Sequence, residues 1–458
     1  MALHDPLSLE PLDAPLSALL DHARAAGATA ADAIGIYGRS ASISVRGGEL
    51  EDIDNSEGFD IGLRVMVGQE GSMRQATVSS SDLSAGTLKR LAERAVAMAR
   101  LAPEDPYAGL APEDRLSERR DADGLELFDP TELDPARLKD RALAVEAAAL
   151  SVPGVRQAEG AQASYNWSAV RLKTSHGFDG GYQSSRHGVS VSAVAEKDGA
   201  MERDYDYHNM RWLEDLRDPG DIGRKAGERA VARLGSTPME SGALPVIFDA
   251  RVSAALPSAL ISAITGSAVA RGISFLKDDL GETLFPAHQA ITDEPLRVRG
   301  LASRPFDGEG VSVGSFDIIR DGRLQSWLLN TSAARQLGLA STGHAARGLS
   351  GAPGIAASNV VLAGGTLDRD GLIREAGTGL LVREMFGPSL NPTTGDYSVG
   401  VSGFAVRGGQ LAEPVSEVTI AGNLRDVFAS LVAGSDMDWD REIASPSLLV
   451  EGLTIAGR

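Results

Sequence analysis

The chain has 458 residues, of which 43% are hydrophobic, and its formal charge at pH 7 is −19. This length exceeds what one hydrophobic core usually serves and predicts two or three domains. The acidity argues against nucleic-acid binding, which needs clustered Lys and Arg, and the absence of Cys excludes disulfides, thiolate metal ligands and a Cys nucleophile. Residues 1–16 show no signal-type pattern and no window is apolar enough to span a membrane, so we expect a soluble cytoplasmic protein.

The first predicted domain covers residues 1–110 and combines helices with strands. Residues 16–26 place their Leu side chains on one helical stripe. Residues 58–67 alternate in the manner of a strand and are expected to pair with residues 72–78 across a Gly-containing turn. Residues 85–101 keep the i, i+3, i+4 spacing that predicts an amphipathic helix.

The second predicted domain covers residues 111–236 and is a central α+β region with a long β-ribbon over residues 162–208. Asp134 is a suitable N-cap and is followed directly by Pro, so a helix is expected from there to residue 150. Residues 221–234 are expected to form the last helix of this region.

Three carboxylates alternate with larger side chains at the end of this ribbon. Glu202, Asp204 and Asp206 share one strand face, and Tyr205 and Tyr207 share the other. We expect a solvated sheet face here, because charge alternation is common on strands. The alternative is an acidic wall that faces an interior chamber or a basic partner.

The third predicted domain covers residues 237–458 and is rich in strands. A hairpin is expected over residues 397–420, because Gly408-Gly409 suits a two-residue turn with positive φ. The apolar alternation changes phase at Gly403-Phe404, which predicts a β-bulge. The expected fold class is therefore α+β, with a mixed α/β N-terminal region of antiparallel ribbons and flanking helices, followed by a β-rich C-terminal domain.

Several short sequence motifs, called family words below, carry a family resemblance. They stand in order along the chain at residues 62–65 (GLRV), 80–84 (SSDLS), 201–205 (MERDY), 300–303 (GLAS), 341–344 (STGH) and 420–424 (IAGNL). Together with residues 391–424, these words resemble the TldD/PmbA family, whose members are known as modulators of DNA gyrase and are linked to peptidase activity. The wording is similar to the PmbA branch, also called TldE.

This resemblance has a consequence for metal binding. The TldD branch carries a helix with the order His-Glu-three residues-His, and a further Cys, which hold a catalytic Zn²⁺. The corresponding stretch here, residues 252–266, is expected to be one apolar helix and has Ile261, Ser262 and Gly266 at the motif positions. None of the three can bind zinc. The resemblance therefore implies no catalytic residue, no metal site and no cofactor in this chain, with Zn expected in a TldD-like partner.

The function implied by the resemblance is that of a metal-free PmbA/TldE-type subunit. Such a subunit pairs with a TldD-like metallopeptidase that cuts unfolded or small peptides, and it contributes the chamber and peptide binding. The candidate peptide contacts are His344, Thr394, Asp396 and Asn423, which lie in family words on predicted turns and loops. For His344 the alternative is a hydrogen bond that anchors its loop.

Three other functions stay open at this point. The chain could be a stand-alone peptidase with an unrecognised site, a non-enzymatic regulatory protein that binds gyrase, or a homodimer without an enzymatic partner. Whether the chain is itself an enzyme is accordingly open. The missing metal ligands, in a chain that otherwise keeps the family words, favour the non-catalytic subunit.

Overall fold

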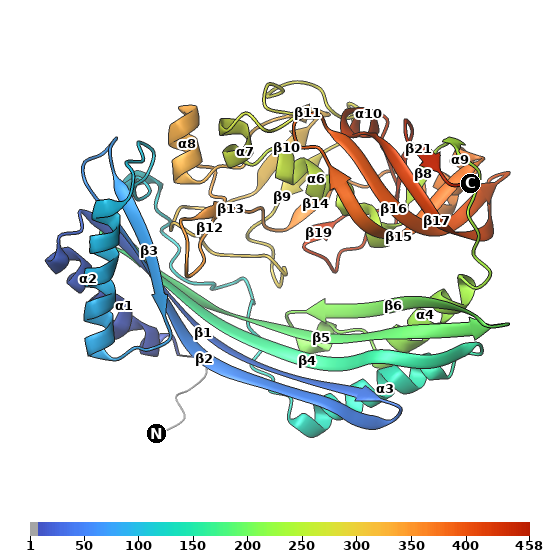
Figure 1. The fold of residues 1–458 in the computed structure, drawn as a ribbon, viewed down its shortest axis with the longest axis horizontal. Helices are drawn as coiled ribbons and strands as arrows, with labels where there is room; N and C mark the ends of the chain where they lie inside the picture. Colours follow the sequence, from blue (N-terminus) through green and yellow to red (C-terminus); the bar gives the residue numbers. More distant parts are fainter. Residues whose placement is uncertain (1–7) are drawn as a thin grey trace.

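The computed structural model describes residues 8–458 and has the α+β architecture expected from the sequence. A long, curved antiparallel sheet is built by the first half of the chain, and a β-rich C-terminal unit lies above it (Figure 1). Within residues 8–458, no helix combines the length and the apolar character needed to cross a membrane. The cytoplasmic location stays a prediction, and residues 1–7 of the segment examined for a signal pattern lie outside the described residues.

The long sheet has six strands in the order β3-β2-β1-β4-β5-β6, and all neighbours are antiparallel. Its strands are β1 (Ala30–Arg46), β2 (Glu49–Val67), β3 (Arg74–Ser80), β4 (Val155–Thr174), β5 (Asp179–Lys197) and β6 (Ala200–Met210). β1 pairs with β4 from Asp32↔Thr174 to Val45↔Ala161. One sheet therefore runs through the first two predicted domains, whose boundary at residue 110 stays a prediction.

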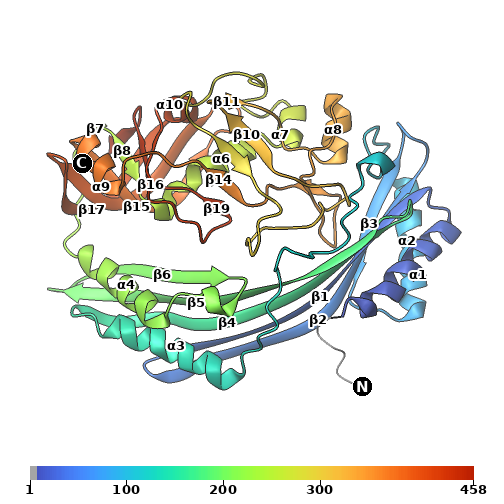
Figure 2. The same ribbon diagram turned by 180° about the vertical axis from the view of Figure 1, so that it is seen from behind.

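Two pairs of helices cover this sheet (Figures 1 and 2). The helices are α1 (Glu10–Ala26), α2 (Ala85–Leu101), α3 (Pro135–Leu150) and α4 (Pro219–Ala232). α1 and α2 bury Leu16 and Val96 against Leu63 at one end, and α3 and α4 bury Leu138 and Ile222 over β4 and β5. Each half thus has the order αβββα, with its apolar stripe turned toward the strands.

The C-terminal unit contains two larger sheets and one short strand pair. Eight strands follow the order β18-β20-β8-β15-β16-β17-β21-β7, five follow β11-β10-β9-β14-β19, and β12 pairs with β13. The bounds are β7 (Gly242–Ala243), β8 (Val246–Phe248), β9 (Ile291–Asp293), β10 (Phe316–Arg320), β11 (Arg323–Leu324), β12 (Ala345–Ala346), β13 (Gly354–Ile355), β14 (Val360–Leu362), β15 (Gly379–Leu390), β16 (Asp396–Arg407), β17 (Gln410–Asn423), β18 (Val432–Ala433), β19 (Ile443–Ala444), β20 (Leu448–Val450) and β21 (Thr454–Ala456).

The hairpin predicted in this unit is present as β16 and β17. Gly408 and Gly409 have φ values of 55° and 72°, as a two-residue turn with both φ positive requires. The strand register shifts between Val401 and Gly403 and again between Phe404 and Val406. The predicted bulge is therefore confirmed, and it adjusts a hairpin whose inward side chains belong to the main C-terminal core.

The helices of this unit are short, and three of them replace the single helix that was expected over residues 252–266. Their bounds are α5 (Ala250–Ser253), α6 (Ala255–Ala263), α7 (Gly266–Ala270), α8 (Thr331–Leu337), α9 (Arg369–Ala376) and α10 (Leu424–Ala429). The single helix expected over residues 252–266 is wrong, because three pieces replace it. Thr265 is extended and forms a β-bridge with Leu328, and the Gly266 N–H donates to the Leu328 carbonyl at 2.8 Å. A contact distant in sequence thus keeps α6 from continuing into α7.

Candidate functional site

The three motif positions lie at the junction of α6 and α7. Ile261 packs against the C-terminal core, and the exposed Ser262 hydroxyl donates to the Ser258 carbonyl at 3.0 Å. Gly266 is buried, and a Cβ added there would lie 2.4 Å from Leu329 Cδ2. The backbone at Gly266 is thus packed too closely to admit a larger side chain without rearrangement. Within residues 8–458, no group of three or more His, Cys, Asp or Glu side chains is placed to hold a metal ion.

Thr394, Asp396 and Asn423, three of the four predicted peptide contacts, form one exposed cluster. Asp396 and Asn423 face each other across β16 and β17. The Thr394 hydroxyl donates to Asp396 Oδ2 at 2.7 Å, and Asn423 Nδ2 donates to Asp396 Oδ1 at 3.1 Å. These hydrogen bonds lower the pKa of Asp396, so its carboxylate is charged at neutral pH. Asn423 also caps α10 by accepting the Arg425 N–H at 3.0 Å.

His344, the fourth predicted contact, lies apart from this cluster in the protein interior. Its Nε2 is 3.0 Å from Asp293 Oδ2, its Nδ1 is 2.8 Å from the Thr342 hydroxyl, and its residue is only 2% exposed. Burial by itself raises the pKa of Asp293, but hydrogen bonds from His344 and Ser358 outweigh it and lower that pKa. Both ring nitrogens are therefore engaged, which matches the loop-anchoring alternative. A contact between His344 and peptide stays a prediction without support from this placement.

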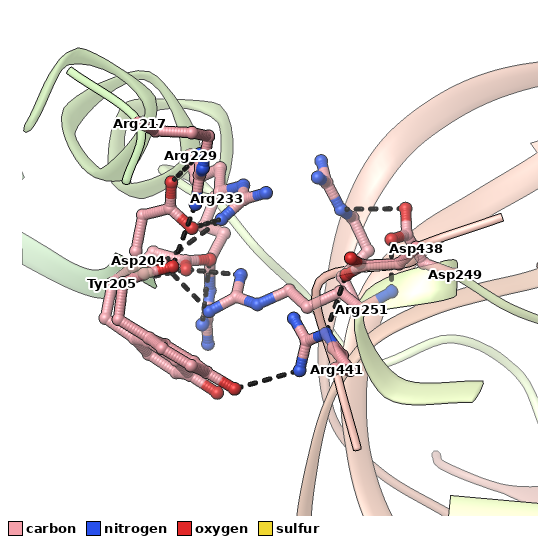
Figure 3. A network of polar contacts seen from close by, with 12 residues as sticks. Asp204, Tyr205, Arg217, Arg229, Arg233, Asp249, Arg251, Asp438 and Arg441 are labelled. Carbon is pink, nitrogen blue, oxygen red and sulfur yellow. Dashed lines mark hydrogen bonds and ion pairs between the residues drawn. The ribbon is translucent and has the colours of Figure 1, made fainter. Parts of the chain in front are cut away.

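The acidic face of β6 is buried rather than solvated. Asp204 and Asp206 are 4% and 7% exposed, so the expected solvated face is wrong. Arg217 and Arg229 contact Asp206 at 2.9 and 3.0 Å, and Arg251 contacts Asp204 at 2.6 Å (Figure 3). Burial is possible because each carboxylate is paired. The acidic face meets a basic group of residues from this chain's own α4 region and C-terminal unit.

The tyrosines between these carboxylates also contact the C-terminal unit. The rings of Tyr205 and Tyr207 stack with centroids 6.2 Å apart. The Arg251 guanidinium lies 4.1 Å from the Tyr205 ring centroid, and Arg441 donates to the Tyr207 hydroxyl at 2.9 Å. β6, an edge strand of the long sheet, therefore joins the two halves of the molecule through ion pairs and cation–π contacts.

A cavity of about 590 Å³ lies beside this joint. Its wall combines β6 and α4 with α5, α9, β15 and the segment before β19. The charged residues that line it are Arg186, Arg217, Lys225, Arg229, Arg251, Arg369, Arg383, Arg441, Asp206, Asp249, Asp438, Asp440 and Glu442. Sequence reasoning missed this site, because the residues come from many elements and share no short spacing. The alternating carboxylates of β6 were the one local signal of it.

A second ionic contact joins the opposite end of the sheet to the C-terminal unit. Asp32 on β1 receives Arg64 Nε at 2.5 Å and Arg347 Nε at 3.0 Å, and all three side chains are at most 4% exposed. Next to it, a Cβ added to Gly62 would lie 2.3 Å from the Leu349 carbonyl oxygen. The family word at residues 62–65 thus contains two residues that set how closely the halves approach.

Comparison with known proteins places this arrangement in a class of metallopeptidase-like chains. Models of the PmbA/TldA metallopeptidase match domain 1 over residues 31–99, the central domain over 128–234 and the C-terminal domain over 241–457. The metalloprotease PmbA of Escherichia coli O157:H7 is 38% identical over 420 residues, which are 91% of this chain and 90% of that protein. A PmbA homologue of Haemophilus influenzae is 34% identical over 418 residues, with the same coverage of 91% and 90%.

Solved structures agree with these matches. A Bacteroides thetaiotaomicron protein described as a candidate modulator of DNA gyrase is 28% identical, with a TM-score of 0.87 over 98% of this chain and 100% of that one. TldE of Thermococcus kodakarensis shares the fold at 21% identity, with a TM-score of 0.83 over 97% of this chain and 100% of that one. The chain belongs to the PmbA/TldD family, as the sequence words predicted.

Proposed function

We propose that this chain is the metal-free subunit of a two-subunit metallopeptidase of the TldD/TldE type that acts on unfolded or small peptides. The observation that carries the proposal is the residue set at the family's motif positions. Ile261 and Gly266 offer no metal ligand, and Leu329 packs against the backbone where a motif His side chain would begin. The TldD-like partner supplies zinc and the general base.

The contribution of this chain is proposed to be the chamber and the holding of peptide. The exposed Asp396 carboxylate, oriented by Thr394 and Asn423, can receive a peptide N–H or ammonium group. Its position at the start of β16 suits a substrate that runs as an extended strand, because main-chain hydrogen bonds hold such a peptide with little sequence preference. His344 is retained only as an anchor of its loop.

The outer edge of β2 supports pairing with a different chain rather than with a second copy. β3 pairs only with residues 61–67 of β2, so the described part of the chain provides no outer neighbour for residues 49–60. This edge carries Glu49, Glu51, Asp52, Asp54, Glu57 and Asp60. Two such edges would repel each other, whereas a strand edge of a less acidic partner would not.

The test is reconstitution from purified subunits. This chain, a TldD-like subunit and their equimolar mixture are each incubated with casein or a flexible peptide, with and without a chelator. We expect cleavage only in the mixture, and none once the chelator has removed the zinc. Metal analysis of each subunit locates the zinc. Cleavage by this chain alone, with no gain from the partner, would show that it is a stand-alone peptidase and contradict the proposal.

A further inference from the structure

The cavity beside β6 has more positive than negative side chains, although the whole protein carries a charge of −19. Eight Arg and Lys residues line it, against five Asp and Glu residues. An excess of cations inside an acidic protein is not a consequence of overall composition. We therefore ask whether the excess of Arg and Lys in the cavity wall serves to bind an anionic ligand.

Most of the carboxylates in the cavity wall are already engaged. Asp438 pairs with Arg441 and Glu442 with Arg186, each at 2.6 Å, and Asp440 lies 3.0 Å from His208 Nε2. Asp206 is shared by two Arg residues of the α4 region. These carboxylates have little capacity left to neutralise further cations.

Three cations remain with weak or no counter-charge. Arg369 on α9 and Arg383 on β15 approach the same oxygen, Asp249 Oδ2, at 3.6 and 3.5 Å. Arg369 Nε also lies 3.7 Å from the exposed Asp370. None of these contacts is a hydrogen bond, and both Nε atoms and Asp249 Oδ2 are buried without a hydrogen-bond partner. Lys225 on α4 has no ion pair within residues 8–458. Burial, followed by the nearby Arg229, lowers the pKa of Lys225.

Leaving buried N–H groups of a charged guanidinium without acceptors is unfavourable. We propose that this cavity binds an oxyanion, which is either a carboxylate or a phosphate group. Arg369 and Arg383 hold it, and Lys225 faces it from α4. Planar guanidinium groups match the geometry of both anions, and two of them can bind one oxyanion through several N–H donors. Asp249 is too distant to satisfy these donors.

The dimensions of the cavity suit a small anionic ligand or the end of a peptide. Its volume of about 590 Å³ lies within the range of roughly 300–1,000 Å³ usual for ligand pockets. The ring of Tyr207, which lines the cavity, offers an apolar surface for the body of such a ligand. The oxyanion could belong to a free peptide C-terminus or to a phosphate-bearing molecule. Both present oxygens that guanidinium groups can bind, and the experiment below distinguishes them.

The test uses the isolated full-length chain, so its outcome does not depend on the proposed partner. Isothermal titration calorimetry at low ionic strength and neutral pH is carried out with inorganic phosphate, with trialanine, and with trialanine amide. We expect saturable binding of phosphate, of trialanine or of both, and at least tenfold weaker binding of the amide than of trialanine wherever trialanine binds. Binding of phosphate alone identifies a phosphate-bearing ligand, and binding of trialanine alone identifies a peptide carboxyl end.

Arg369→Gln and Arg383→Gln locate the site. Each is expected to weaken binding at least tenfold, whereas Arg374→Gln is the matched control, because Arg374 lies on the same α9, is 67% exposed and does not line the cavity. The thermal midpoint of each variant shows that it is folded, and the more exposed Arg369 provides a second variant if Arg383→Gln unfolds. The proposal is overturned if no oxyanion binds saturably, if trialanine is the only oxyanion that binds and its amide binds equally, or if both cavity variants bind like wild type.

Discussion

The two ionic contacts between the long sheet and the C-terminal unit differ in how they are packed. At Asp32, Arg64 and Arg347, the charges lie against one another and almost no surface is exposed. At β6, the ion pairs border a cavity of about 590 Å³ with unsatisfied guanidinium groups. The first contact holds two arginines on one carboxylate at 2.5 and 3.0 Å and leaves a single buried nitrogen, Arg347 Nη2, without a hydrogen-bond partner among the described residues. The second has no carboxylate from residues 8–458 within hydrogen-bond distance of the Nε atoms of Arg369 and Arg383, and both residues line the cavity.

Their energetic consequences should differ accordingly. Removing one partner of a dry, buried ion pair leaves an uncompensated charge in a medium of low dielectric constant. Removing a charge beside a water-accessible cavity is less damaging, because water can solvate the remaining partner. The following predictions test this contrast, from the largest expected effect to the smallest.

Asp32→Asn is expected to have the largest effect on stability. It removes the carboxylate that contacts both Arg64 and Arg347, and breaking such a buried pair typically destabilises by about 3–5 kcal/mol. The free energy of unfolding from denaturant titration measures the loss. Asp21→Asn is the control, because its pair with Arg24 is exposed on both sides and should contribute less than about 1 kcal/mol. Equal losses in the two variants would show that the contact is not dry.

Gly62→Ala tests the steric side of the same contact. The added methyl group would lie 2.3 Å from the Leu349 carbonyl oxygen, a backbone atom that cannot rotate away. Overpacking of this kind is expected to destabilise by about 1–3 kcal/mol. Gly58→Ala on the same strand is the matched control, because nothing lies within 4 Å of its added Cβ. If both variants unfold at the same denaturant concentration, the halves do not approach each other as closely as described.

Asp206→Asn tests the contact at the cavity through its pH dependence. Burial raises the pKa of Asp206, but Arg217 and Arg229 outweigh it, so the folded-state pKa lies below the unfolded value of about 3.9. The carboxylate therefore stabilises the fold fully above about pH 4, and this contribution is lost as the pH falls through the folded-state pKa.

At pH 7 we expect Asp206→Asn to lower the free energy of unfolding by about 1–3 kcal/mol, since hydrogen bonds to charged groups are lost. The difference from wild type should shrink on acidification below about pH 4. The exposed Asp140→Asn on α3 is the control and should change stability by no more than about 0.5 kcal/mol. A difference that stays constant down to pH 3 would contradict the assignment.

Asn423→Ala should have the smallest effect on stability. It removes the side chain that caps α10, which is expected to be worth about 1 kcal/mol. Asn423→Ser restores an acceptor for the Arg425 N–H and should recover most of the loss in a thermal melt. If reconstituted peptide cleavage falls in both variants while stability recovers only in the serine variant, Asn423 acts on peptide as well as on the helix.

Much of the fold could be predicted because its signals are local. The apolar stripe over residues 85–101 predicts a helix, and α2 has these bounds. Asp134 is predicted as an N-cap, and α3 begins directly after it and ends at Leu150 as expected. The Gly408-Gly409 turn was equally readable, since positive φ at two adjacent residues has few other solutions. The helix expected over residues 252–266 failed at two places. Leu328, distant in sequence, pairs with the backbone of Thr265 and Gly266, and Pro257 has no N–H to continue the helix across the break at Ala254.

For the candidate site, too, local features could be predicted from the sequence and contacts between distant elements could not. The sequence by itself determined the family and the residue types at the motif positions, and it named the three residues that the structure brings together at the start of β16. These features depend on residue identity and on pairing across one hairpin. Only the tertiary structure decided that both ring nitrogens of His344 have hydrogen-bond partners and that the carboxylates of β6 face arginines. The physical reason is that burial and charge pairing arise when distant elements meet, and a one-dimensional pattern of charges does not specify which opposite charges will lie beside it.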